Sequence, residues 1–422
     1  MAKKQNVENR VSRWGEFVCS VVLISAFLPK LILSDGVNVY LPELVIFLSL
    51  FVYGIKQFFF FKEQRILAGL FGAMVIFSIV SLASVEDSGS ILRSVKEILY
   101  IAIIFWASKI SDPEGFMKKI VLCASLAMVL NILMFAAGYS IGNSIWGDAD
   151  ALSSGMSNKG FSLADFQIQQ LPGLAHGIWG SYCVLSVVVA TTLYKRQIIG
   201  KKSFLLNLAL FLINMAISVS RESILILIVV ILCFIIFSNG KLINKIFIVG
   251  FAAIAVAVVI QLGDSLPLFQ KITYMIDSFS SGNTDGNIQI RINTWAAYGD
   301  FVLDNLHYLF MGLGISPENF YEHIKNYSTG EIVSVPESAF VYVQAYGGLL
   351  STICMVLLII TCGRKISGIN YKLIKYFFVG LLLTNLFSGV SMFSDLLYAH
   401  LCLIYGIVVL NKKKDENFAY NS

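Results

Sequence analysis

The sequence is poor in the residues and motifs that separate domains or bind small cofactors. Only 7 of its 422 residues are proline, and no stretch rich in proline or serine could act as a linker. None of the seven cysteines has C-x-x-C spacing, which indicates small apolar residues and neither a disulfide nor a metal framework. A glycine-rich phosphate loop and zinc-ligand spacing are also absent. These absences predict one integral domain, residues 1–422, that needs no nucleotide, metal or other cofactor.

Charged residues are scarce as well, and long apolar runs take their place. Hydrophobic residues make up 57% of the chain and the mean hydropathy is +0.77, which is typical of membrane proteins. Most runs approach the roughly 20 residues that cross a bilayer as a helix. The sequence therefore predicts an all-α, multi-pass membrane protein with about 12 transmembrane helices. The runs cover residues 15–33, 41–61, 66–84, 91–110, 120–139, 174–194, 203–220, 224–238, 242–262, 338–361, 373–390 and 396–410.

The distribution of basic residues predicts the orientation of these helices. Alternate breaks between the runs hold 23 of the 31 lysines and arginines, and both chain ends belong to this set. Because basic residues concentrate in cytoplasmic loops, we expect both termini in the cytoplasm. The net charge of +5 arises from these short loop flanks, so it gives no indication of nucleic-acid binding.

Two loops on the predicted outer face are long, residues 140–173 and 263–337. Connections beyond about 15 residues are usually functional or disordered. The second loop contains two amphipathic helix patterns, at 266–279 and 288–306, and Gly312–Leu313–Gly314 is expected to end the second pattern. Such helices are predicted to lie on the membrane surface and cover a cavity. The alternative is a loop that packs on neighbouring helices without a function of its own.

Three arginines stand on the outer face, where the sequence has few basic residues. Arg221 lies in a break so short that two spans form a tight hairpin, Arg291 lies in the large loop, and Arg93 begins a span. An arginine near the hydrocarbon boundary needs an anion, and its planar fork suits phosphate. We therefore predict binding of a lipid-linked phosphate or diphosphate. The alternatives are pairing of Arg221 with Glu222 or with headgroups, a solvated helix face for Arg291, and pairing of Arg93 with Glu97.

Glu337 is the candidate general base, since it stands at the outer end of the run that begins at residue 338. Acidic residues also cap helix N-termini, so capping is the competing interpretation. His307 and His323 in the large loop, and His176 at the outer start of another span, are weaker candidates for catalysis.

At these residues the chain resembles the O-antigen polymerase and O-antigen ligase superfamily. Each motif is short, but their order, spacing and shared outer placement agree with the family over roughly residues 200–360. The first half of the chain is similar in hydropathy only. The matching motifs are Ser220–Arg221 between two spans, Arg291 followed by Trp295, Met311–Gly312–Leu313–Gly314, Pro336–Glu337–Ser338 and Tyr346–Gly347–Gly348.

The resemblance implies polymerisation of undecaprenyl-diphosphate-linked repeat units into O-antigen, capsule or exopolysaccharide, on the outer face of the bacterial cytoplasmic membrane. Arg221, Arg291 and Arg93 would bind the diphosphate, and Glu337 would accept a proton. A chain-length regulator and a flippase would be partners, and the activated sugar would arrive on its lipid without nucleotide or metal. Ligases of this superfamily carry histidine where this chain has Glu337, which favours a polymerase. The open alternatives are a ligase, a polysaccharide flippase or 12-span carrier, and a non-catalytic assembly scaffold.

Overall fold

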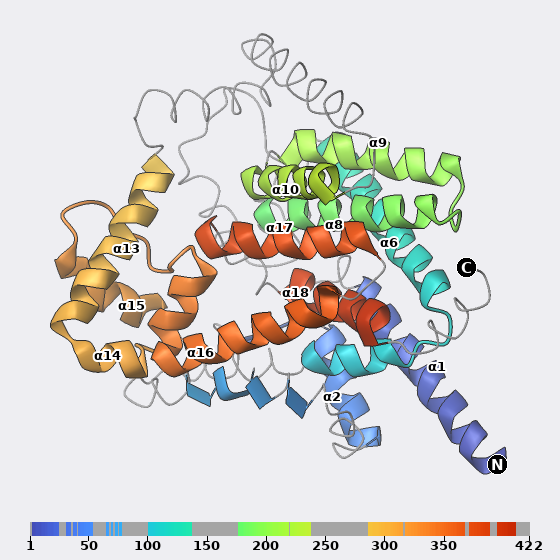
Figure 1. Cartoon of the computed structure of the whole chain (residues 1–422), viewed down its shortest axis with the longest axis horizontal. Helices are drawn as coiled ribbons and strands as arrows, with labels where there is room; N and C mark the ends of the chain where they lie inside the picture. The colour runs from blue at the N-terminus through green and yellow to red at the C-terminus, as the bar shows by residue number, and fades with distance from the viewer. Residues whose placement is uncertain are drawn as a thin grey trace, which may run out of the picture. The chain divides into compact units, whose positions relative to one another are not determined.

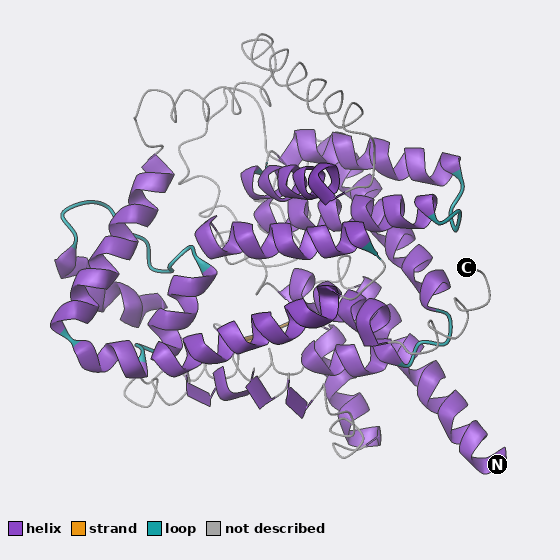
Figure 2. Ribbon diagram, viewed as in Figure 1, coloured by secondary structure: helices purple, strands orange, loops and turns teal. Residues whose placement is uncertain are grey.

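The computed structural model is almost entirely helical in the parts of the chain that it describes (Figure 1 and Figure 2). It divides into two compact units, and each is considered by itself. Unit 1 comprises residues 1–123, 293–371 and 385–422, and unit 2 comprises residues 124–292 and 372–384. The structure describes residues 2–24, 31–34, 37–39, 41–53, 65–66, 69–70, 72–74, 76–77, 100–136, 176–218, 220–237, 286–314, 317–367, 371–388 and 395–410.

The helices coincide with most of the apolar runs that fall in the described residues. They are α1 (Ala2–Ile24), α2 (Leu41–Tyr53), α6 (Pro113–Ala136), α8 (His176–Lys195), α9 (Lys201–Ser218), α10 (Arg221–Phe237), α13 (Gly286–Asp304), α14 (Leu306–Met311), α15 (Pro317–Ile324), α16 (Ala339–Ser367), α17 (Lys372–Ser388) and α18 (Asp395–Tyr405). Short helical turns follow as η4 (Lys325–Tyr327) and η6 (Gly406–Leu410), and a helical segment without a label runs over residues 100–108.

Among the residues that the structure describes, three helical segments are long and apolar enough to cross a membrane, and they support a helical membrane protein. These are Pro113–Met134, Gly177–Lys195 and Ala339–Ile366, with 22, 19 and 28 residues. The run 242–262, the loop 140–173 and the amphipathic pattern 266–279 lie outside the described residues. The expectation of a helical membrane protein is therefore confirmed in this coarser form.

One short hairpin departs from the all-α prediction. Strand β1 (Leu31–Ser34) pairs antiparallel with β2 (Val37–Val39), with Leu31 opposite Val39. The first apolar run was expected to remain helical to residue 33, but α1 ends at Ile24. The residues between the strands are Asp35–Gly36, a dipeptide that is typical of two-residue hairpin turns. Hydropathy alone does not carry this local turn signal.

In unit 1, helix α2 runs parallel to the helical segment 100–108. The Tyr100 hydroxyl donates to the Glu43 carboxylate at 2.6 Å, and the Trp106 indole N–H donates to the Ser49 hydroxyl at 3.0 Å. Both pairs are separated by 57 residues in the chain, so the two helices keep one register over about two turns. Glu43 is buried, although its neighbours in α2 are apolar.

In unit 2, helices α6, α8 and α9 are joined by buried amides. Asn131 donates to the Asn214 side chain at 2.9 Å, and Asn214 donates to the Leu210 carbonyl within its own helix. Asn207 lies two turns earlier on α9 and donates to the hydroxyls of Ser125 and Ser186, each at 2.9 Å. Polar side chains of this kind hold membrane helices together, because in hydrocarbon they have no water to bind.

Candidate functional site

Trp295 and the motifs at 311–314, 336–338 and 346–348 lie in one packed substructure of unit 1, which we call the loop subdomain (residues 293–314 and 317–348). It comprises most of α13, then α14, α15, η4 and the first turns of α16. Its core is aromatic, and Phe301 touches the rings of Tyr308, His323 and Tyr327 at centroid distances of 5.2 to 5.6 Å. The buried core residues are Ala297, Tyr298, Phe301, Val302, Leu313, Phe320, Ile324, Ala345 and Tyr346.

Helix α13 holds the segment that leads to Glu337. The Val333 amide donates to the Thr294 hydroxyl at 3.1 Å, and the Asn293 side-chain amide donates to the Glu331 carbonyl at 3.3 Å. Thr294 is fully buried, whereas Val333 is half-buried. We call these two hydrogen bonds the α13 clamp. Arg291 lies on the same helix, less than one turn before the clamp, and its side chain is half-buried.

Glu337 directly precedes the N-cap residue of α16. The residue at the N-cap position is Ser338, whose carbonyl accepts the first helical hydrogen bond, from Tyr342 at 2.8 Å. The Ser338 hydroxyl accepts from the Val341 amide at 3.5 Å and donates to the Leu386 carbonyl at 2.6 Å. Ser338 therefore occupies the N-cap position, and the half-buried Glu337 directly precedes it.

Helix α16 is broken at Gly348, and Gly312, which follows α14, packs against the break. Gly348 has φ +68° and Gly312 has φ +72°, a conformation that L side chains rarely adopt. A Cβ atom on Gly312 would lie 2.6 Å from the Gly348 nitrogen, and one on Gly348 would collide with the Phe310 carbonyl. The two backbone segments, at Gly312 and at Gly348, therefore approach more closely than any side chain would allow.

At the break, amide groups from the segment after α14 donate hydrogen bonds to backbone carbonyls of α16. Leu313 N–H donates to the Ala345 carbonyl at 2.6 Å, and Gly314 N–H donates to the Tyr346 carbonyl at 3.0 Å. Gln344 adds a side-chain bond to the Leu309 carbonyl at 2.9 Å. A break inside a membrane helix is tolerated where neighbouring protein supplies such partners. The motifs 311–314 and 346–348 are therefore one structural joint.

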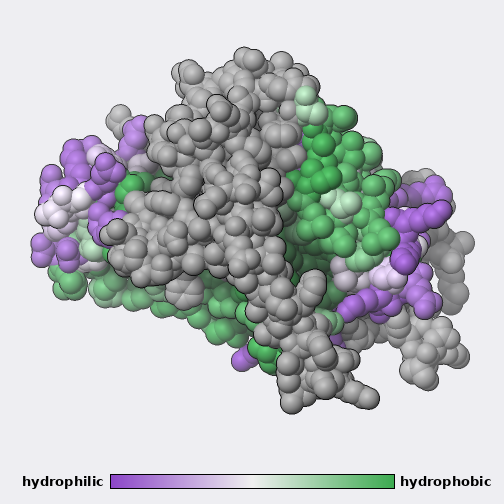
Figure 3. All heavy atoms as spheres, turned by 90° about the horizontal axis from the view of Figure 1, so that it is seen from above, coloured by the Kyte–Doolittle hydropathy of each residue, from purple (hydrophilic) through white to green (hydrophobic). Residues whose placement is uncertain are grey.

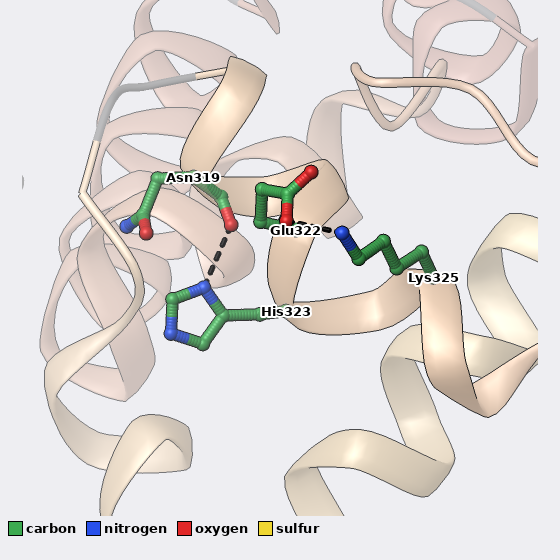
Figure 4. A network of polar contacts seen from close by, with 4 residues as sticks. All are labelled: Asn319, Glu322, His323 and Lys325. Atoms are coloured by element: carbon green, nitrogen blue, oxygen red, sulfur yellow. Dashed lines mark hydrogen bonds and ion pairs between the residues drawn. The ribbon is translucent and has the colours of Figure 1, made fainter.

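Both loop histidines contact aromatic side chains of the subdomain. His323 lies at the end of α15, with its Nδ1 2.7 Å from the Asn319 carbonyl one turn earlier (Figure 4). The same view shows Lys325 paired with Glu322 and directed away from the imidazole. His307 is exposed on α14 and stacks on Tyr308 at 4.1 Å between centroids. Tyr308 also touches His323, at 5.6 Å, so one tyrosine joins the two histidines.

Tyr298 is a buried phenol on the same core. Burial raises the pKa of its hydroxyl well above the ordinary value, and the interaction with the Gln344 side chain offsets part of that effect. The phenol therefore stays protonated at neutral pH and does not act as a base.

Arg221 belongs to unit 2, where it is the first residue of α10, and its side chain is outside the described residues. The corner is formed by the neighbouring serines: the Ser220 and Ser223 hydroxyls are 2.6 Å apart, and both residues are fully buried. Gly180 of α8 faces them, and a Cβ atom there would collide with the Ser223 hydroxyl. This close helix contact fixes the backbone from which Arg221 projects.

The structure thus brings several of the predicted site residues into one subdomain and leaves others untested. Glu337, His307 and His323 lie in the loop subdomain of unit 1, whereas Arg291, earlier on α13, falls in unit 2. His176 is the first residue of α8 in unit 2. Arg93 lies outside the described residues. Among the residues that the structure describes, no group of three or more histidines, cysteines or acidic residues could hold a metal ion.

No protein-family model and no curated protein matches this chain. Its function therefore has to be argued from the site itself.

Sequence reasoning did not anticipate several residues of the site. Thr294 and Asn293 were missed because a hydrogen bond to a distant loop leaves no local pattern. Gln344 was missed for the same reason, since its partner is a carbonyl 35 residues away. The break at Gly348 does have a signal, because two adjacent glycines interrupt an apolar helix pattern.

Proposed function

We propose that the protein is a membrane glycosyltransferase that polymerises lipid-linked oligosaccharide repeat units at the outer face of the bacterial cytoplasmic membrane. The full architecture in this proposal has about 12 transmembrane helices and both termini in the cytoplasm. The donor is a growing glycan on undecaprenyl diphosphate, and the product is O-antigen, capsule or exopolysaccharide. A chain-length regulator and a flippase are the expected partners.

One observation carries the proposal: the α13 clamp ties the turn after Arg291 to the segment that ends at Glu337. A cation for a diphosphate and a carboxylate for a hydroxyl are the two groups that glycosyl transfer from a lipid diphosphate requires. Their segments are joined by two hydrogen bonds although 46 residues separate them in the chain.

In the proposed reaction, a hydroxyl of the acceptor repeat unit attacks the anomeric carbon of the donor glycan. The bond between that carbon and the diphosphate oxygen breaks, and its electron pair leaves with the diphosphate. Arg291 and Arg221, together with Arg93, stabilise the developing negative charge, which is the largest contribution such a site can make. Glu337 accepts the hydroxyl proton as the new bond forms.

The test separates a charge requirement from a folding requirement. Arg291→Ala and Glu337→Gln should abolish polymer and leave lipid-linked single repeats, with unchanged protein levels in the membrane. Arg291→Lys should also make little polymer, because an ammonium group cannot form a bidentate phosphate contact. Full-length polymer from Glu337→Gln would remove Glu337 from the mechanism and direct attention to His323 and His307.

A secondary carrier is the second candidate, and two observations favour it. Carriers place ionisable residues inside the membrane and use broken helices near their substrate sites. Glu43 is buried against Tyr100, and α16 is broken at Gly348. In a carrier, Glu43→Gln would abolish transport, and no polymer would depend on Glu337. A ligase is the alternative within the same reaction class, and it would transfer finished glycan instead of extending it.

A further inference from the structure

The loop subdomain carries an apolar edge that no part of its own core covers. Four side chains from the end of α13 and from α14 form it, and each is more than half exposed: Leu303 at 71%, Leu306 at 58%, Phe310 at 56% and Met311 at 54%. None of the six residues of α14 is buried. Soluble surfaces scatter such residues singly, whereas a cluster marks contact with a partner or a membrane. We call these four residues the α14 edge.

Charged residues lie on another part of the subdomain. Glu318, Glu322 and Lys325 are exposed on α15 and η4, and Lys325 pairs with Glu322. In Figure 3, the end of the molecule that holds α13, α14 and α15 shows a group of hydrophilic residues and, on another side, hydrophobic ones. The subdomain is therefore amphipathic as a whole, as expected for a structure that lies at an interface.

The joint with α16 fixes the level of the α14 edge relative to the membrane. The Phe310 carbonyl lies against Gly348, and Leu313 and Gly314 bond to the carbonyls of Ala345 and Tyr346. Residues Ala339–Ile366, which make up nearly all of helix α16, are long enough to span a bilayer. The depth of Gly348 within that span is therefore also the depth of α14.

That depth follows from the charged end of α16. Arg364 and Lys365 stand in its last turn and belong at one polar boundary. Gly348 precedes Arg364 by about 16 residues, or about 24 Å of helix. Because the hydrocarbon layer is about 30 Å thick, Gly348 lies just inside the opposite boundary, which falls near Gln344. The exposed stripe on α16 (Leu350, Ile353, Leu357 and Ile360) occupies the layer between these limits.

We propose that the α14 edge is immersed in the acyl chains of the bilayer leaflet into which α16 enters at its N-terminal end. Leu306, Phe310 and Met311 contact the acyl chains, and the charged α15 side faces water. The exposed Asp304, between Leu303 and Leu306, sits at headgroup level and limits how deep the edge goes. This contact holds the loop subdomain at the height of a lipid-linked phosphate, but it does not depend on the proposed reaction.

Depth measurements on the full-length protein in vesicles of phosphatidylcholine test the proposal. Nitroxide labels are placed singly at Phe310→Cys, at Leu306→Cys and, as the matched control on the charged side, at Glu322→Cys. The half-buried Cys123, Cys233, Cys354 and Cys362 are first replaced by alanine, and the thermal unfolding midpoint confirms that the protein stays folded. Collisions with oxygen report the lipid interior, and collisions with a water-soluble nickel chelate report solvent.

The ratio of oxygen to nickel collisions should be several-fold higher at residues 306 and 310 than at residue 322. Equal ratios at all three positions would place the α14 edge in water and overturn the proposal. If neither reagent reaches the labels at 306 and 310, protein covers the edge, either another segment of this chain or a second copy. That result would also overturn the proposal. The vesicles contain no polyprenyl lipid, so a high ratio identifies acyl chains as the occupant.

Discussion

Replacing Thr294 with valine should loosen the segment that leads to Glu337 without creating a cavity. Valine has nearly the shape of threonine, but it lacks the hydroxyl that accepts the Val333 amide at 3.1 Å. An amide left without a buried partner costs about 1–3 kcal/mol. Val333 is half-buried, so water can partly replace the lost acceptor and the cost falls near the lower end, about 1–2 kcal/mol.

A change of that size alters the ratio of clamped to unclamped molecules by about 5- to 30-fold. If Glu337 acts only from the clamped arrangement, the rate of glycosyl transfer by Thr294→Val should fall by up to a similar factor. Thr294→Ser is the matched control, because it keeps the oxygen and loses only a methyl group. Its rate should stay within a few-fold of the native rate.

Hydrogen–deuterium exchange of the peptide that covers residues 331–335 measures the clamp directly. Exchange should accelerate in Thr294→Val and remain near native in Thr294→Ser, and transfer rates should follow the same order. Native exchange in the valine variant would show that the contact does not hold the segment. Faster exchange with native transfer rates would show that the segment has no part in the reaction.

Two further outcomes follow from the packing of the helices. Gly348→Ala should strongly reduce the amount of folded protein, because the backbone there is left-handed and the new Cβ atom would collide with the Phe310 carbonyl. In Gly363→Ala, on the same helix, the new Cβ atom meets nothing within 4 Å, so this variant should be neutral or slightly stabilised. Thermal unfolding of the two purified variants in one detergent measures the difference. Asn214→Leu should lower stability by about 0.6–1.7 kcal/mol, since it removes the bond from Asn131, and an unchanged unfolding midpoint would mean that the amide network contributes nothing.

Local patterns in the sequence predicted the elements of the loop subdomain closely. The amphipathic pattern at 288–306 became α13 (Gly286–Asp304), and the apolar run that starts at 338 became α16, which starts at Ala339. Gly312 does end a helix, but that helix is the separate α14, because the chain turns at Asn305. Spacing within one helix is a local property, so apolar periodicity and glycine signals can be read from neighbouring residues.

The contacts that build the candidate site could not be predicted in the same way. Thr294 meets Val333 across 39 residues, and Tyr100 meets Glu43 across 57. Such pairs depend on how helices pack, which no single stretch of sequence specifies. The assignment of Glu337 shows the difference, since an acidic residue before a helix suggests a cap until the neighbouring Ser338 is seen to fill that role.

The central claim is that this chain by itself extends a lipid-linked glycan. The most direct measurement uses the purified protein in vesicles, supplied with the undecaprenyl-diphosphate-linked repeat unit extracted from its own strain, with product length resolved on a gel. We predict a ladder of glycans that differ by one repeat unit, formed without nucleotide or added metal, and no ladder from Glu337→Gln. Repeat units that remain single with the folded native protein would contradict the account.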